Sequence, residues 1–252
     1  MGGLRAQYFG EIIFTTFQCI NGDIPALERH FERLLKGAYF LWGEDIDSCL
    51  LEKGFHQKVL GLKSGVYRLE LFSRSSELLF GLIKTKELDF SIHRREKRHK
   101  SHIKACFSRG RRGKLPGWPK YLKTSFQVPL FHELDMAKKL KCDDVIFLGS
   151  DEHIIEASTS NILSYKRGIF YFPMFDEGEG LEGLTTQLIK EKCIKNEARI
   201  IEKYLTPKEL LSMDHIWFCN CVQGAVSVSS ITDPLNDKKI KYKEVKIESL
   251  LS

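Results

Sequence analysis

The chain has 252 residues, of which 42% are hydrophobic and 29% are charged, and its formal net charge is +6. This length and composition suit one large or two modest domains with a buried core, and they exclude a wholly disordered chain. No run approaches the roughly 20 consecutive apolar residues that span a bilayer, and the N-terminus lacks the layout of a signal peptide, so we expect a cytoplasmic protein without a membrane partner.

The first third of the chain alternates strand and helix signals. Residues 12–20, rich in β-branched and aromatic side chains, predict a strand that turns at Asn21-Gly22-Asp23. Residues 25–42 place apolar side chains at helical spacing after Pro25, which predicts a helix. Two further strands are predicted at 66–73 and 78–85.

A basic run follows from His93 to Lys114 and holds much of the positive charge. Three interpretations compete. The run is a solvated strand-and-loop face, a positive field that attracts a small anionic metabolite, or a nucleic-acid surface. The last is disfavoured because aromatic residues are not interleaved with the basic ones. The first two interpretations stay open. The expected partner is a small anionic metabolite as substrate, and no nucleic-acid partner is expected.

Glycine and proline crowd residues 109–123, which predicts a connector. Beyond it the pattern predicts a helix over 125–141, strands at 143–149, 153–159, 161–165 and 168–173, a helix over 185–196, a short helix opened by Thr206-Pro207, and a buried strand at 215–222. The expected fold class is α+β with two domains, 1–113 and 123–252, joined by a connector at 114–122.

The cysteine pattern excludes two kinds of site. Seven cysteines are scattered and odd in number, which does not suit a disulfide framework. Cys219 and Cys221 are too close together for the usual C-x-x-C zinc spacing, and we interpret them as buried residues of a strand. No metal site is expected.

One ordered set of residues stands out. Lys123-Thr124-Ser125 precedes a predicted helix, then Asp143-Asp144, an apolar strand, a turn at 150–152, Glu156 and Asn161 follow in order. Upstream lie Phe9-Gly10-Glu11-Ile12-Ile13-Phe14-Thr15-Thr16 and His30-Phe31-Glu32-Arg33-Leu34. Over nearly its whole length the chain resembles the class IV (fold type IV) aminotransferase family, whose members use pyridoxal 5'-phosphate (PLP).

The resemblance implies a fold type IV enzyme with the cofactor in the crevice between its domains, and it implies a homodimer. Lys123 corresponds to the lysine that forms a Schiff base with the cofactor and then moves the substrate's α-proton. Glu156 corresponds to the carboxylate that keeps the pyridine nitrogen protonated. Lys120, three residues before Lys123, is a decoy in the connector.

The resemblance also implies a phosphate site and some departures from the family pattern. The expected cofactor contacts are Arg33, Asn161, Leu184, Thr185, Asn220 and Cys221, where the helix N-terminus at Leu184-Thr185 offers free N–H groups. Phe126 and Gln127 stand where many relatives have Asn and Tyr, and Thr186 replaces a common arginine. These changes bear on cofactor binding.

Within the family three sequence features favour 4-amino-4-deoxychorismate lyase. They are Phe14-Thr15-Thr16, the approach LPGWPKYLKT to the lysine, and the strand FCNC. This lyase would form 4-aminobenzoate and pyruvate for folate synthesis. The alternatives are an aminotransferase for branched-chain or D-amino acids and a degenerate, non-catalytic relative. Candidate substrate residues are Thr15 and, from charge alone, Arg74, Arg109 and Arg111.

Overall fold

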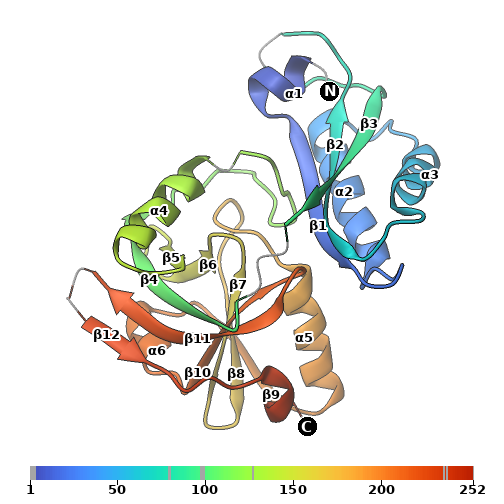
Figure 1. Cartoon of the computed structure of the whole chain (residues 1–252). Helices are drawn as coiled ribbons and strands as arrows, with labels where there is room; N and C mark the ends of the chain where they lie inside the picture. The colour runs from blue at the N-terminus through green and yellow to red at the C-terminus, as the bar shows by residue number, and fades with distance from the viewer. Residues whose placement is uncertain are drawn as a thin grey trace. The chain divides into compact units, whose positions relative to one another are not determined.

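The computed structural model describes residues 4–78, 81–96, 100–126, 128–234, 236 and 238–251. The chain divides into two compact units, each shown in Figure 1. Unit 1 comprises Met1–Arg98 with Tyr121–Gln127, and unit 2 comprises His99–Lys120 with Val128–Ser252. No helix among the described residues is long and apolar enough to cross a membrane.

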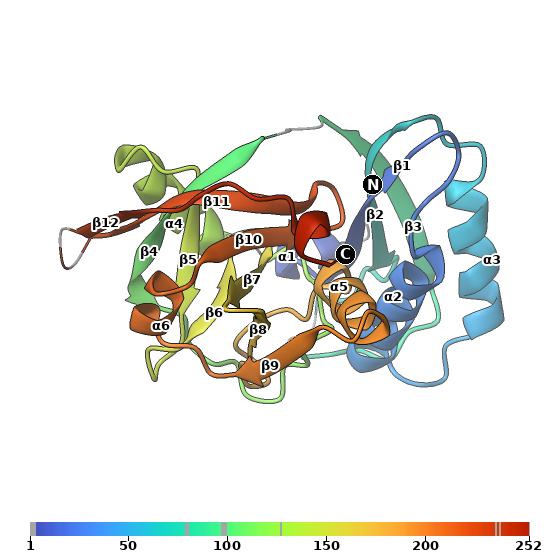
Figure 2. The same cartoon turned by 90° about the horizontal axis from the view of Figure 1, so that it is seen from below.

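Unit 1 is a three-stranded antiparallel sheet with helices. Its elements are α1 (Leu4–Phe9), β1 (Ile12–Cys19), α2 (Leu27–Trp42), α3 (Ser48–Val59), β2 (Gly65–Ser73) and β3 (Leu88–Arg95), with strand order β1-β2-β3. Figure 2 shows α2 and α3 together beside this sheet, and α2 packs on β1 while α3 packs on β3. Phe17, Leu34, Phe55 and Leu69 fill the core between them at 1% exposure or less, as the alternation of β1 and the helical spacing of α2 require.

The strand predicted at 78–85 is wrong in its described part. Residues 81–87 have no strand structure, and the third strand is β3. Gly81 has a φ of 110°, and Leu78 and Leu82 are 46% and 61% exposed. Because neither leucine faces the core, the apolar content of this segment does not place it in the sheet. Leu79 and Phe80 lie outside the described residues.

Unit 2 is built on one large mixed sheet. Its elements are β4 (His102–Arg111), α4 (Val128–Lys139), β5 (Asp144–Leu148), β6 (Ile154–Ala157), β7 (Asn161–Lys166), β8 (Ile169–Pro173), α5 (Leu184–Lys195), β9 (Arg199–Lys203), α6 (Pro207–Leu211), β10 (His215–Asn220), β11 (Gly224–Asp233), β12 (Lys238–Lys241) and the 3-10 helix η1 (Ile247–Leu250).

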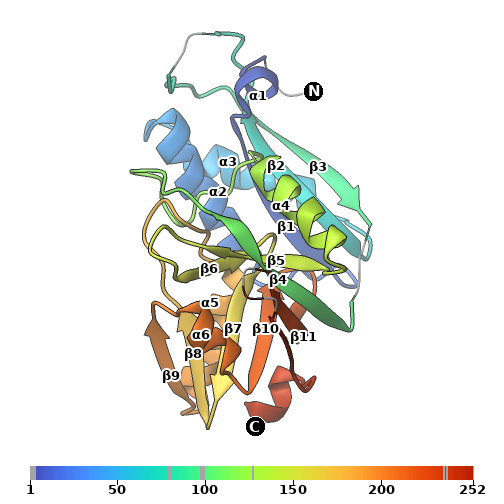
Figure 3. The same ribbon diagram turned by 90° about the vertical axis from the view of Figure 1, so that its left-hand side faces the viewer.

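The sheet of unit 2 runs β6-β5-β4-β11-β10-β7-β8-β9, with β12 paired to β11. Strand β6 also contacts β7 and β8, so the sheet curls on itself, as Figure 3 lets the reader follow. Helix α4 packs on β4 and β5, and α5 packs on β9 and β10. The helix opened by Thr206 is confirmed: Thr206 and Glu209 form a capping box at the start of α6.

The two units differ from the predicted domain bounds at two places. Strand β4 pairs with β11 and β5, which puts residues 102–111 with the C-terminal strands. Residues 121–127 return to unit 1, because Thr124 forms a bridge with Ile13 and the Phe14 N–H donates to the Lys123 carbonyl at 2.9 Å. The predicted lysine is therefore held by strand β1.

The basic run is not one continuous surface. Within β4 the side chains of Ile103, Ala105 and Phe107 are buried, whereas Lys104, Arg109 and Arg111 are exposed. The strand thus belongs to the interior of unit 2 and carries its charges on one face and at its end. Lys97, Arg98 and His99 of this run lie outside the described residues.

Candidate active site

Lys123 lies in unit 1 on a short segment that runs antiparallel to strand β1. Its backbone carbonyl accepts the Phe14 N–H, and Ser125 N donates to the Ile12 carbonyl at 3.0 Å. The Lys123 Nζ lies 5.0 Å from the centre of the Phe14 ring, a cation–π distance. Lys123 is half-buried. The backbone contacts hold this half-buried lysine in a fixed position, as a reactive amine requires.

His30 lies near two predicted residues of unit 1, Thr15 and Arg33, and near Lys123. Thr15, 1% exposed on β1, bonds through Oγ1 to His30 Nδ1 at 2.5 Å. His30 lies one turn before Arg33 on α2, and both are buried. Burial, with the positive charges of Arg33 and Lys123, lowers the pKa of His30 to about 3. The imidazole is therefore neutral at physiological pH and lies within electrostatic reach of both cations.

Arg68 is a residue of this region that the sequence reasoning missed. It lies on β2 opposite Thr16, and its guanidinium carbon lies 3.6 Å from the centre of the Phe14 ring. Its Nε donates to Glu70 Oε1 at 2.6 Å, with the Arg68 side chain 14% exposed. Burial lowers the pKa of Arg68 in spite of Glu70. Lys123 and Arg68 thus share one aromatic ring, which only the pairing of β1 with β2 could reveal.

Glu156 is the predicted cofactor carboxylate, and it lies in unit 2. It lies on β6 at 8% exposure. One carboxylate oxygen pairs with Arg112 Nη1, and the other accepts the Leu181 N–H at 3.1 Å. These donors hold the ionised, acceptor-only carboxylate in a fixed orientation. Arg112, which follows β4 directly, was not predicted, because nothing in the spacing indicates that it pairs with Glu156.

Asn161 and the start of α5 form the next group. Asn161 Nδ2 donates to the Leu181 carbonyl at 2.7 Å, and a Cβ at Gly183 would overlap Asn161 Oδ1. Gly183 is the N-cap of α5 and provides no side-chain cap. Leu184 and Thr185 therefore begin a helix whose first N–H groups lack a capping side chain, which suits an anion such as a phosphate group.

Asn220 is the last residue of β10, and Cys221 follows it near this helix start. The prediction of a buried strand residue is confirmed for Cys219 and is wrong for Cys221, which is half-buried in the turn after the strand. Thr185 Oγ1 lies 3.3 Å from Cys221 Sγ, so the structure brings these two predicted residues together. Asn220 Nδ2 donates to Ser160 Oγ at 2.9 Å, and its Oδ1 accepts the N–H groups of Val222 and Gln223. The side chain of Asn220 thus orders the turn after β10, a structural role that is compatible with a backbone contact to phosphate.

The turn after β6 is ordered by Asp144. Its Oδ1 accepts the N–H groups of Val145 at 2.8 Å and Ser158 at 3.2 Å. Burial raises the pKa of Asp144 in spite of these bonds. The turn carries Ser160, the partner of Asn220, so Asp144 supports the same part of unit 2 as Glu156 and Asn161.

The three arginines predicted for substrate lie apart from these groups within their own units. In unit 1, Arg74 forms an exposed ion pair with Asp89 at 2.5 Å, away from the Phe14 ring by the register of β2. In unit 2, Arg111 pairs with Glu152 at 2.5 Å, and Arg109 is exposed. No contact joins them to the predicted cofactor residues among the contacts described for each unit.

The departures from the family pattern have partial explanations. Phe126 is 69% exposed, and Gln127 lies outside the described residues. Thr186 Oγ1 donates to the Gly183 carbonyl at 2.8 Å, within the first turn of α5. Thr186 therefore stabilises the helix start that the phosphate assignment needs.

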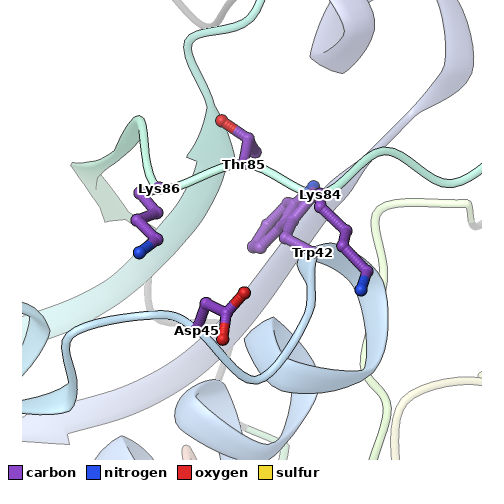
Figure 4. Close-up of a pocket in the computed structure, with 5 residues that line it drawn as sticks. All are labelled: Trp42, Asp45, Lys84, Thr85 and Lys86. Carbon is purple, nitrogen blue, oxygen red and sulfur yellow. The ribbon is translucent and has the colours of Figure 1, made fainter.

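A separate hollow lies in unit 1 at the end of α2. Its volume is about 120 Å³, and Trp42, Asp45, Lys84, Thr85 and Lys86 line it (Figure 4). It contains none of the residues predicted from the family pattern.

Comparisons with known proteins identify the family of the chain. The family model for amino-transferase class IV matches residues 12–231. A protein of Rickettsia typhi named as a branched-chain-amino-acid aminotransferase is 24% identical over 98% of this chain and 86% of its own length.

Two solved structures share the fold. A Legionella pneumophila structure named as a 4-amino-4-deoxychorismate lyase has a TM-score of 0.84 at 21% identity, over 100% of this chain and 93% of that one. A Brucella abortus aminotransferase bound to the cofactor PLP has a TM-score of 0.81 at 16% identity, over 100% of this chain and 90% of that one.

The chain belongs to the class IV aminotransferase family, and it is a PLP-dependent enzyme with the fold of that family. The residues of each unit fit the cofactor. Unit 2 offers a buried, oriented carboxylate at Glu156 and an uncapped helix N-terminus at Leu184, and unit 1 offers a half-buried amine at Lys123. The family contains both lyases and aminotransferases, so membership leaves the reaction open.

Proposed function

We propose that this chain is a lyase that converts 4-amino-4-deoxychorismate into 4-aminobenzoate and pyruvate. The observation that carries the proposal is the cationic neighbourhood of Lys123. Arg68 lies on the same aromatic ring as Lys123, and both are partly removed from water. A substrate with two carboxylates gains more from such a field than an aliphatic amino-acid side chain does.

The roles of the residues follow from the chemistry. PLP, when bound, withdraws electrons from the carbon that carries the substrate's amino group. We assign the PLP attachment and the proton transfer at that carbon to Lys123, the contact with the pyridine nitrogen to Glu156, and the phosphate to Arg33, Leu184, Thr185, Asn220 and Cys221, with Asn161 supporting the Leu181 segment.

The reaction balances without a further reactant. Lys123 takes the proton from the carbon that bears the amino group, the ring C–O bond to the enolpyruvyl group breaks, and enolpyruvate leaves with the bonding electrons. A proton delivered to enolpyruvate yields pyruvate, and the ring becomes aromatic. The neutral His30 beside Lys123 does not compete for this proton, because its pKa is lowered to about 3.

Arg68 extends the proposal to the substrate. Both arginines pair with a carboxylate, Arg68 with Glu70 and Arg74 with Asp89. We assign a substrate carboxylate to Arg68 because its guanidinium lies on the same aromatic ring as Lys123. The Arg68→Lys variant keeps the charge but loses the planar fork and its stacking on Phe14. We expect it to raise KM for aminodeoxychorismate, with Arg74→Lys as the matched control that leaves KM unchanged.

The experiment that tests the reaction is direct. Cofactor-loaded protein is mixed with freshly made aminodeoxychorismate, and 4-aminobenzoate fluorescence and pyruvate are followed together. Equal amounts of both products support the lyase. No product from protein with an intact cofactor absorption band contradicts it.

The second candidate is an aminotransferase, which the similarity to the Rickettsia typhi protein favours. It uses the same lysine and carboxylate. Its signature is conversion of the bound cofactor to the pyridoxamine form by a single amino acid, in the absence of a 2-oxo acid. Screening branched-chain L-amino acids and D-amino acids by absorbance separates this activity from the lyase.

We also propose a homodimer. Large apolar side chains are exposed on and near α1 in unit 1: Leu4 (40%), Tyr8 (70%), Phe9 (38%) and Phe126 (69%). Such side chains on one unit are typical of a surface that another molecule covers. Sedimentation of wild type against Tyr8→Glu tests it: wild type should sediment as a dimer and the variant should shift toward monomer.

A further inference from the structure

Unit 2 contains a buried histidine–glutamate pair that the cofactor assignment does not use. The side chains of His153 and Glu179 are 8% and 3% exposed, and His153 Nε2 lies 2.9 Å from Glu179 Oε2. The same oxygen accepts the Asp176 N–H at 2.7 Å. Because an ionised carboxylate only accepts hydrogen bonds, the imidazole N–H is the donor. Burial of this carboxylate without such donors would be costly.

A glycine makes room for the pair. A Cβ at Gly149 would lie 2.6 Å from His153 Cε1 and 2.9 Å from Glu179 Oε1, which real side chains do not tolerate without movement. Gly149 N also donates to the His153 carbonyl at 2.9 Å, and the Tyr204 ring packs edge-on against the imidazole at 5.2 Å. The pair therefore has one well-defined arrangement.

The pair anchors the loop that runs from β8 to α5. Leu115 N donates to the Gly178 carbonyl at 3.0 Å, and Glu179 follows directly. Two residues later, Leu181 donates its N–H to Glu156 and accepts from Asn161. Two residues span at most about 7 Å of chain. A shift of Glu179 therefore moves the Leu181 amide away from the Glu156 carboxylate.

We propose that His153 and Glu179 are positioning residues for Glu156, because they hold residues 176–183 where the Leu181 amide contacts its carboxylate. This inference rests on the proposed role of Glu156 at the cofactor. Neither residue is a catalytic residue, and both act through Leu181. Loss of the pair removes the Leu181 contact at Glu156 Oε2, and the contact of Arg112 with Oε1 does not replace it.

The test uses the protein with PLP and five variants, of which Glu156→Gln tests the assigned role of Glu156 itself. Glu179→Ala removes the anchor, Gly149→Ala displaces the pair without removing either member, and Glu179→Gln keeps an oxygen that accepts from His153 and Asp176. Glu202→Gln is the matched control, because Glu202 pairs with Lys190 at 2.6 Å on the exposed surface of the same unit. Two readouts are taken: the Kd for PLP, and hydrogen exchange at the Leu181 amide.

The expected result is a graded one. Glu179→Ala and Gly149→Ala should weaken PLP binding about tenfold and speed Leu181 exchange by about tenfold or more, the effect of losing one well-placed hydrogen bond. Glu179→Gln should stay within about twofold of wild type on both readouts. The control should match wild type.

Other outcomes are equally informative. Unchanged Leu181 exchange in folded Glu179→Ala overturns the inference, as does a lowered denaturation midpoint with unchanged PLP affinity, which marks a merely structural pair. If Glu179→Ala does not fold, Gly149→Ala decides by the same criteria. If PLP binding is weaker in Glu156→Gln but normal in Glu179→Ala, the positioning role of His153 and Glu179 is overturned and the role of Glu156 stands. If PLP binding is normal in Glu156→Gln, the assigned role of Glu156 is overturned.

Discussion

Because His30 is neutral in the folded protein, it makes the free energy of unfolding depend on pH. Substitution of His30 removes this contribution and so measures it. In the unfolded chain its pKa is the ordinary 6.5, and in the folded protein burial and the charges of Arg33 and Lys123 lower the pKa to about 3. Between these values the unfolded state binds the proton and the folded state does not. The contribution of His30 is therefore complete above pH 6.5 and is lost progressively as the pH falls toward 3.

The magnitude follows from linkage. Between pH 7.5 and pH 5 this one group should lower the free energy of unfolding by about 2 kcal/mol. His30→Gln removes the titration and keeps a group that can bond to Thr15 Oγ1. The loss of stability between the two pH values should therefore be about 2 kcal/mol smaller in the variant than in wild type.

The assay is urea unfolding at both pH values, with the imidazole signal of His30 followed by NMR in the folded protein. His132→Gln is the control, since the His132 side chain is 76% exposed. Parallel pH dependence in wild type and His30→Gln would refute the reasoning. So would a His30 resonance that titrates near its ordinary value in the folded protein, because the desolvation argument would then have no basis.

Three further predictions concern unit 2. Arg112→Met removes the ion pair between Arg112 and Glu156, and we expect PLP affinity to fall by about tenfold or more. Equilibrium binding measures it, with Lys190→Met as the control, because the partner of Lys190, Glu202, is exposed. Equal affinity in the two variants would count against the pairing. Burial raises the pKa of Asp144 in the folded protein, so its ionised form lowers the free energy of unfolding. The stability that the protonated carboxyl contributes is lost as the pH rises through the raised pKa. Asp144→Asn keeps the oxygen that accepts from Val145 and Ser158. The variant should be at least as stable as wild type at pH 8, and the difference in stability should be smaller at pH 4. Destabilisation by more than about 1 kcal/mol at pH 8 would contradict the burial argument. Thr206→Ala removes the capping box of α6 and should cost about 1 kcal/mol in urea unfolding, while Thr206→Ser should cost little; equal losses in both would show that the cap is not the cause.

The sequence predicts elements well where local pattern and packing agree. Strand β1 and helix α2 follow from side-chain periodicity, and α6 follows from its Thr-Pro start. Strand β3 was not predicted, because Leu88–Arg95 is rich in charge and a more apolar segment precedes it. Its place in the sheet depends on pairing with β2, which is distant in the sequence and is not indicated by the local pattern. Strand β9 was missed for a similar reason, since it pairs in parallel with β8 at the edge of the sheet.

The candidate site divides in the same way. The order of Lys123, Glu156 and Asn161 identifies the family, because their spacing along the chain is itself the signal. Arg68 and Arg112 carry no such signal, since their roles depend on a shared aromatic ring and on an ion pair across the fold. Two of the arginines chosen from charge alone, Arg74 and Arg111, pair with Asp89 and Glu152. Charge indicates what a region attracts, and only packing shows which side chain is placed to bind.

The most direct test of the central claim compares Lys123→Ala with Lys120→Ala. Lys120 lies three residues earlier, belongs to unit 2, and has its Nζ 5.3 Å from the centre of the Phe175 ring. Both proteins are loaded with PLP, their cofactor absorption is recorded, and 4-aminobenzoate formation from aminodeoxychorismate is followed. We predict that Lys123→Ala loses the band of bound cofactor and all product, and that Lys120→Ala keeps both. Product formation at the wild-type rate by Lys123→Ala would contradict the account.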